Sequence, residues 1–151
     1  MRLVLAAVLV ALAATPALPG ERPAADVWPR VTHHLDEANR LATHFEGVLR
    51  ESCPRFATPA EWESYLDEEL QRVVLLVAHV EQAWVEAKTT DDDEVRRAAK
   101  APRRRVPAAR GLVDKLAGCA EANGTHLPVG ALWKRVEQDV PRVQAQINLP
   151  R

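Results

Sequence analysis

Apolar residues recur at alternating intervals of three and four along most of this chain, and that spacing is the strongest constraint on its fold. In the first such segment they are Trp28, Val31, Leu35, Ala38, Ala42, Phe45 and Leu49. The spacing places them on one face of an α-helix, which has to be buried against another element. It predicts a helix over residues 27–51, with Asp26 as N-cap, Pro29 in the first turn and Cys53-Pro54 beyond its end.

A second helix begins with two independent start signals. Thr58-Pro59-Ala60-Glu61 combines a capping box with a proline at the first helical position. The same apolar spacing continues to Ala87, which predicts a helix that ends near Lys88. Residues 73–78 are apolar on almost every side, so we expect this segment either at the centre of the domain or in an oligomer contact.

Two prolines interrupt the third helical segment. Pro102 and Pro107 each lack a backbone donor, and a proline inside a helix costs about 3 kcal/mol. We expect a short helix over 92–101, a break, and a second piece over 107–122 that ends at Asn123-Gly124. The third helix is therefore predicted to be broken.

A fourth helix is predicted over residues 128–148, with a kink or a split at Pro141. No segment shows the sustained alternation of a β-strand. The expected fold is all-α, a four-helix up-down-up-down bundle with a proline-broken third helix.

The two cysteines fit this topology. Cys53 follows the first helix and Cys119 lies in the last turn of the third, so both are expected at the same end of the bundle. An exported chain with two cysteines favours their pairing. We predict that one Cys53–Cys119 disulfide closes the bundle.

Residues 1–20 have the pattern of a secretory signal peptide. Met1-Arg2 supplies the positive start, an apolar run extends to Ala14, and cleavage is expected after Ala17 or Gly20. Residues 21–151 are then one helical domain, exported to the periplasm or secreted, with no membrane span in the mature chain.

The composition and the missing motifs exclude several kinds of function. A net charge of −1 argues against a globally basic nucleic-acid binder. There is no Gly-x-Ser-x-Gly serine motif and no glycine-rich phosphate loop, so we do not expect an enzyme. The leading hypothesis is a protein that acts by binding, with an unknown protein or an anionic surface as its partner.

Histidines supply the main alternative. The chain lacks Cys-x-x-Cys-His for covalent haem and Glu-x-x-His for a di-iron site, so no cofactor is expected from motifs. However, His34 and His79 fall at similar heights on neighbouring helices, beside the apolar faces. The alternative function is therefore an electron-transfer bundle that binds haem or copper through this pair, whereas His33 and His44 are expected to face water.

A basic segment between residues 96 and 110 is the candidate binding site. It contains seven cations and no acid: Arg96, Arg97, Lys100, Arg103, Arg104, Arg105 and Arg110. Guanidinium groups suit carboxylates and phosphates, so the segment would bind an anion or an acidic partner. The alternative is a solvated connection balanced by Asp91–Glu94. The absence of interleaved aromatics argues against the binding of single-stranded nucleic acid, and no sequence-specific nucleic-acid partner is expected.

Overall fold

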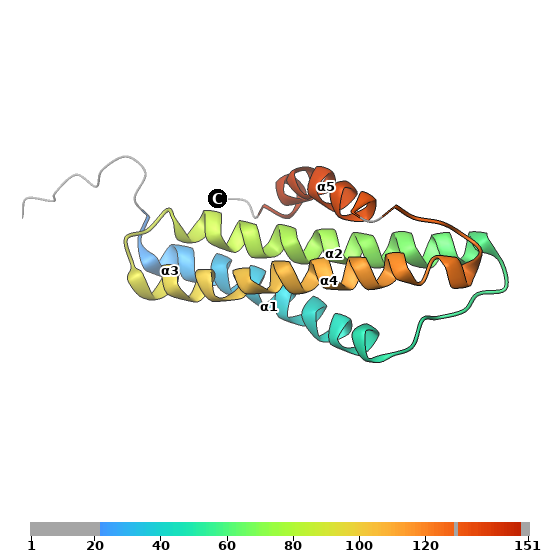
Figure 1. Cartoon of the computed structure of the whole chain (residues 1–151). Coiled ribbons are helices and arrows are strands. Elements are labelled where there is room, and N and C mark those ends of the chain that lie inside the picture. The colour runs from blue at the N-terminus through green and yellow to red at the C-terminus, as the bar shows by residue number, and fades with distance from the viewer. Residues whose placement is uncertain (1–21, 129, 149–151) are drawn as a thin grey trace, which may run out of the picture.

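The computed structural model describes residues 22–128 and 130–148, and the predicted signal peptide lies outside this range. The described chain is all-helical, as the sequence predicts (Figure 1). Its elements are α1 (Ala24–Arg50), α2 (Pro59–Ala87), α3 (Asp93–Lys100), the 3₁₀ turn η1 (Ala101–Arg104), α4 (Arg105–Gly118), the 3₁₀ turn η2 (Glu121–Asn123) and α5 (Ala131–Ile147).

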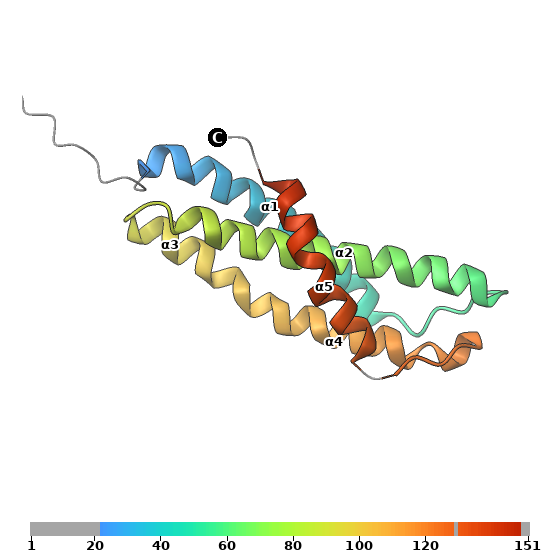
Figure 2. The same ribbon diagram turned by 90° about the horizontal axis from the view of Figure 1, so that it is seen from above.

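The helices form a bundle in which the chain reverses direction at each long connection. Helices α1 and α2 and the continuous arm α3–η1–α4 lie side by side (Figure 1). Helix α5 crosses α2 obliquely (Figure 2). With 17 residues against 29 in α2, α5 is only about 25 Å long and covers part of its neighbour.

Helix α2 is the central element. It packs against α1, α4 and α5, and the capping box predicted at Thr58 and Glu61 is present at its start. Most of residues 73–78 are buried against these three helices. A central position therefore accounts for the apolar circumference of this segment, and an oligomer contact through α2 stays a prediction.

The buried face of α1 differs from the predicted one. Trp28 and Leu49 are 41% and 43% exposed. Apart from the ion-paired Arg30, the buried residues follow a set of positions that is shifted by one residue at three places: Val27, Val31, His34, Ala38, Leu41 and Phe45. Both sets have the same three-and-four spacing, so the period alone does not distinguish them. The helix also begins at Ala24, three residues early, so Pro29 lies inside it and Asp26 is not its N-cap.

The predicted break in the third helix is a change of helix type. Pro102 lies in the first two positions of η1, and Pro107 is the third residue of α4. A proline fits the first turn of a helix, and the change of helix type at η1 gives both prolines such a position. The backbone thus stays helical from Asp93 to Gly118. Likewise α5 continues through Pro141 without splitting, and it begins after Gly130, whose φ is 82°.

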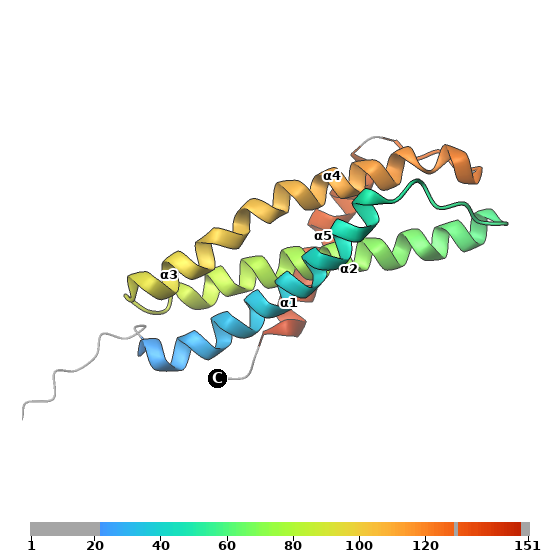
Figure 3. The same cartoon turned by 90° about the horizontal axis from the view of Figure 1, so that it is seen from below.

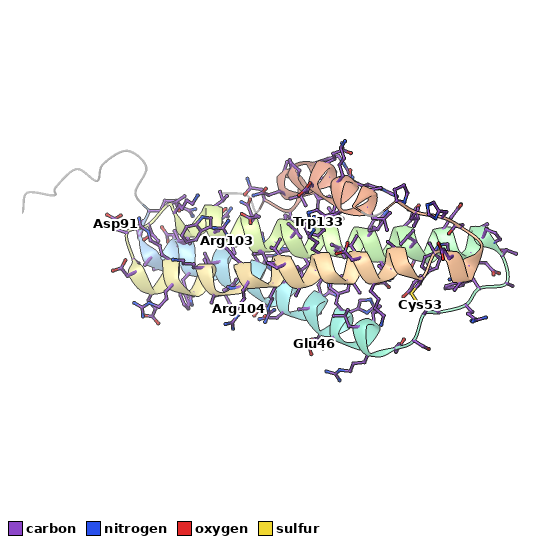
Figure 4. All side chains as sticks on the ribbon, viewed as in Figure 1. Glu46, Cys53, Asp91, Arg103, Arg104 and Trp133 are labelled. Carbon is purple, nitrogen blue, oxygen red and sulfur yellow. A yellow bond between two sulfur atoms is a disulfide. The ribbon has the colours of Figure 1, made fainter. Side chains whose placement is uncertain are left out.

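The disulfide between Cys53 and Cys119 is present, with the two Cα atoms 5.4 Å apart (Figure 4). Asn123 strengthens the same end. Its buried Nδ2 donates to the carbonyl oxygens of Pro54 and Cys119, at 3.0 Å each. The loop after α1 is thereby tied to the end of α4 by one covalent bond and an amide.

Helix α4 also caps α1 directly. Figure 3 shows α1 running obliquely between its neighbours, so that its C-terminal half approaches α4. The Lys115 ammonium donates to the carbonyl oxygens of Val48 at 3.0 Å and Leu49 at 2.8 Å. A cation at this position satisfies terminal carbonyls and complements the helix dipole.

Reduction of the disulfide is expected to lower the melting temperature and leave the helical circular dichroism at room temperature unchanged. The bond joins residues separated by 66 positions, and restricting an unfolded loop of that length stabilises by roughly 4 kcal/mol. Thermal unfolding followed by circular dichroism, with and without reductant, measures the effect. A melt that is insensitive to reductant, or two titratable thiols in the protein purified without reductant, would contradict it.

Candidate functional site

Polar side chains pair across the otherwise apolar contact between α1 and α2. The three pairs are Arg30 with Glu86, His34 with His79, and His44 with Glu69. Residues later in α1 pair with residues earlier in α2, as antiparallel helices require. These pairs form a polar ladder along the contact.

The first rung is a buried ion pair. Arg30 donates from Nε and Nη2 to the two carboxylate oxygens of Glu86, at 2.8 and 2.9 Å. Arg22 and Gln82 also donate to this carboxylate, at 3.1 and 3.3 Å. The hydrogen bonds from Arg30 lower the pKa of Glu86, and this outweighs the opposing effect of burial. The carboxylate is therefore held in its charged form.

The second rung brings together the two histidines singled out from the sequence. The Nδ1 atoms of His34 and His79 lie 3.0 Å apart, and both rings are buried. The Nε2 atom of His34 is buried with no hydrogen-bond partner among the described residues. Leaving a buried N–H donor without an acceptor costs more free energy than leaving an acceptor nitrogen without a donor. We therefore infer that Nε2 of His34 is unprotonated, and that Nδ1 carries the proton and donates it to Nδ1 of His79.

Burial keeps this pair neutral. It lowers the pKa of His34 to about 4, with the neighbouring His79 as the next contribution. Burial also lowers the pKa of His79, although Glu37 opposes the shift. A proton added to either ring would enter a site where charge is poorly solvated.

The geometry limits what the pair can hold. Two axial haem ligands have nitrogens about 4 Å apart, twice a metal–imidazole bond of about 2 Å, with the macrocycle between them. At 3.0 Å the two rings leave no such gap, so haem ligation would require α1 and α2 to separate. In the described part of the chain, no group of three or more His, Cys, Asp or Glu side chains has a metal-binding arrangement.

The third rung corrects the expectation that His44 only faces water. Its Nε2 lies 2.9 Å from Oε2 of Glu69, a carboxylate that is almost fully buried. Arg72 donates to the same carboxylate at 2.6 Å. His33 remains exposed, with its ring centre 6.1 Å from that of His79.

The structure divides the seven cations of the basic segment into two groups. Four have contacts within the molecule. Arg96 pairs with Asp91 at 2.8 Å, and Arg103 contacts Glu81 at 3.5 Å. Arg105 donates to the amide oxygen of Asn39, and the Arg110 guanidinium lies 5.9 Å from the ring centre of Trp133.

The other three cations form an exposed stripe. Arg97, Lys100 and Arg104 have no hydrogen-bond or ion-pair partner among the described residues. Their spacing of three and four places them on one face of the arm, over about 10 Å. Figure 4 shows Arg103 and Arg104 on opposite sides of this arm. We call Arg97, Lys100 and Arg104 the basic stripe.

Sequence analysis missed the charged rungs of the ladder. Arg30 and Glu86 lie one helical turn from His34 and two turns from His79 along their own helices, within the same polar spacing. That spacing is visible in the sequence. The facing partner is not, because it depends on the register between α1 and α2.

Comparison with known proteins identifies no relative. No protein-family model, curated protein or solved structure matches this chain.

Acidification is expected to destabilise the protein through the histidine pair. Since the pKa of His34 falls from 6.5 to about 4 on folding, the unfolded chain binds more protons between these values. The stabilisation is complete above about pH 6.5 and is lost as the pH falls towards 4, by roughly 3 kcal/mol in total. Urea unfolding across this range measures the slope.

A double variant isolates the pair from other titrating groups. In His34→Leu/His79→Leu, the free energy of unfolding should depend less on pH between 6.5 and 4. His126→Gln, which changes an exposed histidine, should keep the wild-type slope. Equal slopes for the double variant and the wild type would contradict the assignment.

Neutralising Glu86 should be far more costly than neutralising a surface acid. Glu86→Gln leaves the buried Arg30 without its bidentate counter-ion and is expected to cost about 3 kcal/mol. Asp67→Asn, on the same helix, removes the exposed pair with Arg135 and should cost no more than about 1 kcal/mol. Chemical denaturation of both variants provides the comparison, and equal losses would show that the ion pair contributes little.

Proposed function

We propose that the protein is exported and acts by binding an anionic surface or partner through the basic stripe, and not by catalysis. The observation that carries the proposal is the separation of Arg97, Lys100 and Arg104 from the cations that contact the molecule's own side chains. Cations that serve the fold have partners within it. These three have none among the described residues.

Two features support export. The N-terminal twenty residues have the pattern of a signal peptide. The Cys53–Cys119 disulfide is typical of an oxidising compartment. Over residues 22–128 and 130–148, no helix is long and apolar enough to cross a membrane.

The chemistry of the stripe supports an anionic partner. Two of its members are arginines, whose planar guanidinium groups bind carboxylates and phosphates with two hydrogen bonds. The stripe lies on a helical arm, so the spacing of its charges is fixed before a partner arrives. A fixed spacing reduces the ordering cost of binding.

The test compares two triple variants with the same change in net charge. Arg97→Gln/Lys100→Gln/Arg104→Gln removes the stripe, and Arg55→Gln/Lys134→Gln/Arg142→Gln removes exposed cations elsewhere. Phosphatidylglycerol vesicles and alginate are the anionic probes, and phosphatidylcholine vesicles are the neutral one. The stripe variant should bind at least about tenfold more weakly to the anionic probe, while its stability changes by about 0.5 kcal/mol or less.

Salt supplies a second criterion. Binding through exposed charges should be lost as the ionic strength rises towards about 1 M, where the Debye length is about 3 Å. Wild-type protein that binds neither anionic probe at low salt would overturn the proposal. So would a stripe variant that binds as well as its control.

The alternative function is electron transfer with haem or copper on His34 and His79. The contact between their rings favours it over other histidine sites, although haem would require the helices to part. The visible spectrum of protein purified from its native compartment tests it. A Soret band or a copper charge-transfer band that disappears in His34→Leu/His79→Leu would favour this alternative.

A further inference from the structure

A small apolar groove opens between α1 and α4, apart from the basic stripe. Its volume is about 110 Å³, and its floor includes Phe45 and Leu76, both buried. Leu49, which is 43% exposed, forms part of its wall, and Ala108 bounds it on α4. The small side chain of Ala108 leaves the apolar floor accessible.

Two charged side chains of opposite sign line the groove, and only one of them has an ionic partner. Glu46 lies 3.6 Å from Arg50, one turn away on the same helix. Arg105 donates to the neutral amide of Asn39 and has no acidic partner among the described residues. The groove therefore combines an apolar floor with an arginine that has no acidic partner among the described residues.

We propose that this groove binds a free medium-chain carboxylate, with the carboxylate on Arg105 and the alkyl chain against Phe45, Leu49 and Leu76. An anionic head and an apolar tail match both features, whereas a neutral or cationic amphiphile matches only the apolar one. Burying each further methylene improves affinity by up to about fourfold until the chain outgrows the groove. The groove and the basic stripe share no residue, so this site does not depend on the proposed function.

The probe is decanoate below its micelle concentration, titrated into the oxidised protein by calorimetry. One saturable site is expected, with weaker binding of butanoate, of decan-1-ol and of decylammonium. Arg105→Gln should weaken decanoate binding at least about tenfold, because it removes the charge that binds the head. Arg110→Gln, a matched change one helical turn and a half further along α4, should leave it unchanged.

Filling the groove is the complementary test. Ala108→Phe places a ring over the apolar floor and should abolish decanoate binding, while Ala145→Phe, at an exposed alanine on α5, should have no effect. Circular dichroism checks that both variants fold. If Ala108→Phe does not fold, Arg105→Gln still tests the site. The triple variant of the basic stripe should still bind decanoate.

Three results would overturn the site. They are an absence of saturable decanoate binding, equal affinity of Arg105→Gln and wild type, and unchanged binding by a folded Ala108→Phe. If the protein binds no decanoate but binds vesicles, and Ala108→Phe abolishes the vesicle binding, the groove binds a membrane lipid. That result rejects the free carboxylate.

Discussion

The register between α1 and α2 is the constraint on which the rest of the structure depends. The bidentate Arg30–Glu86 pair, the His34–His79 contact and the His44–Glu69 contact all form at one alignment of the two helices. A slip by one turn would leave buried carboxylates and imidazoles without partners, which is far more costly than shifting apolar contacts. The polar ladder thus selects one register. Arg30 and Gln82 then extend the network to α5 and its C-cap, through Gln144 and Asn148.

The two ends of the bundle are stabilised by different means. The end that contains the N-terminus of α1 has a small apolar cluster made of valines and alanines. The rest of the bundle has a larger cluster that includes Trp62 and Leu112, with the disulfide and Lys115 closing it. The histidine pair lies near the boundary between these clusters. Where apolar side chains are small, the ion pair and its hydrogen bonds hold α1 on α2, so this half is the more sensitive to charge and pH.

Positive charge serves two purposes in the basic segment. Arg96, Arg103 and Arg105 contact acids or an amide on the molecule itself and help to hold the arm against its neighbours. Arg97, Lys100 and Arg104 have no such role. Changing the helix type at Pro102 keeps these three side chains on a rigid helical surface, where a broken loop would have left them mobile. The position of Arg105 at an apolar groove adds a second surface of different chemistry on the same arm.

Local signals in the sequence determined the helices, the capping box at Thr58, the all-α class and the pairing of Cys53 with Cys119. Each of these depends on neighbouring residues or on the order of helices along the chain. Tertiary structure decided which face of α1 is buried, because Val27 and Trp28 begin sets of apolar positions with the same period. It also decided which cations have a hydrogen-bond or ion-pair partner within the molecule, since Glu81 and Asn39 reach the basic segment only after α1, α2 and α4 have packed. Periodicity describes one helix at a time, whereas burial and pairing depend on the rotation and register of several helices together.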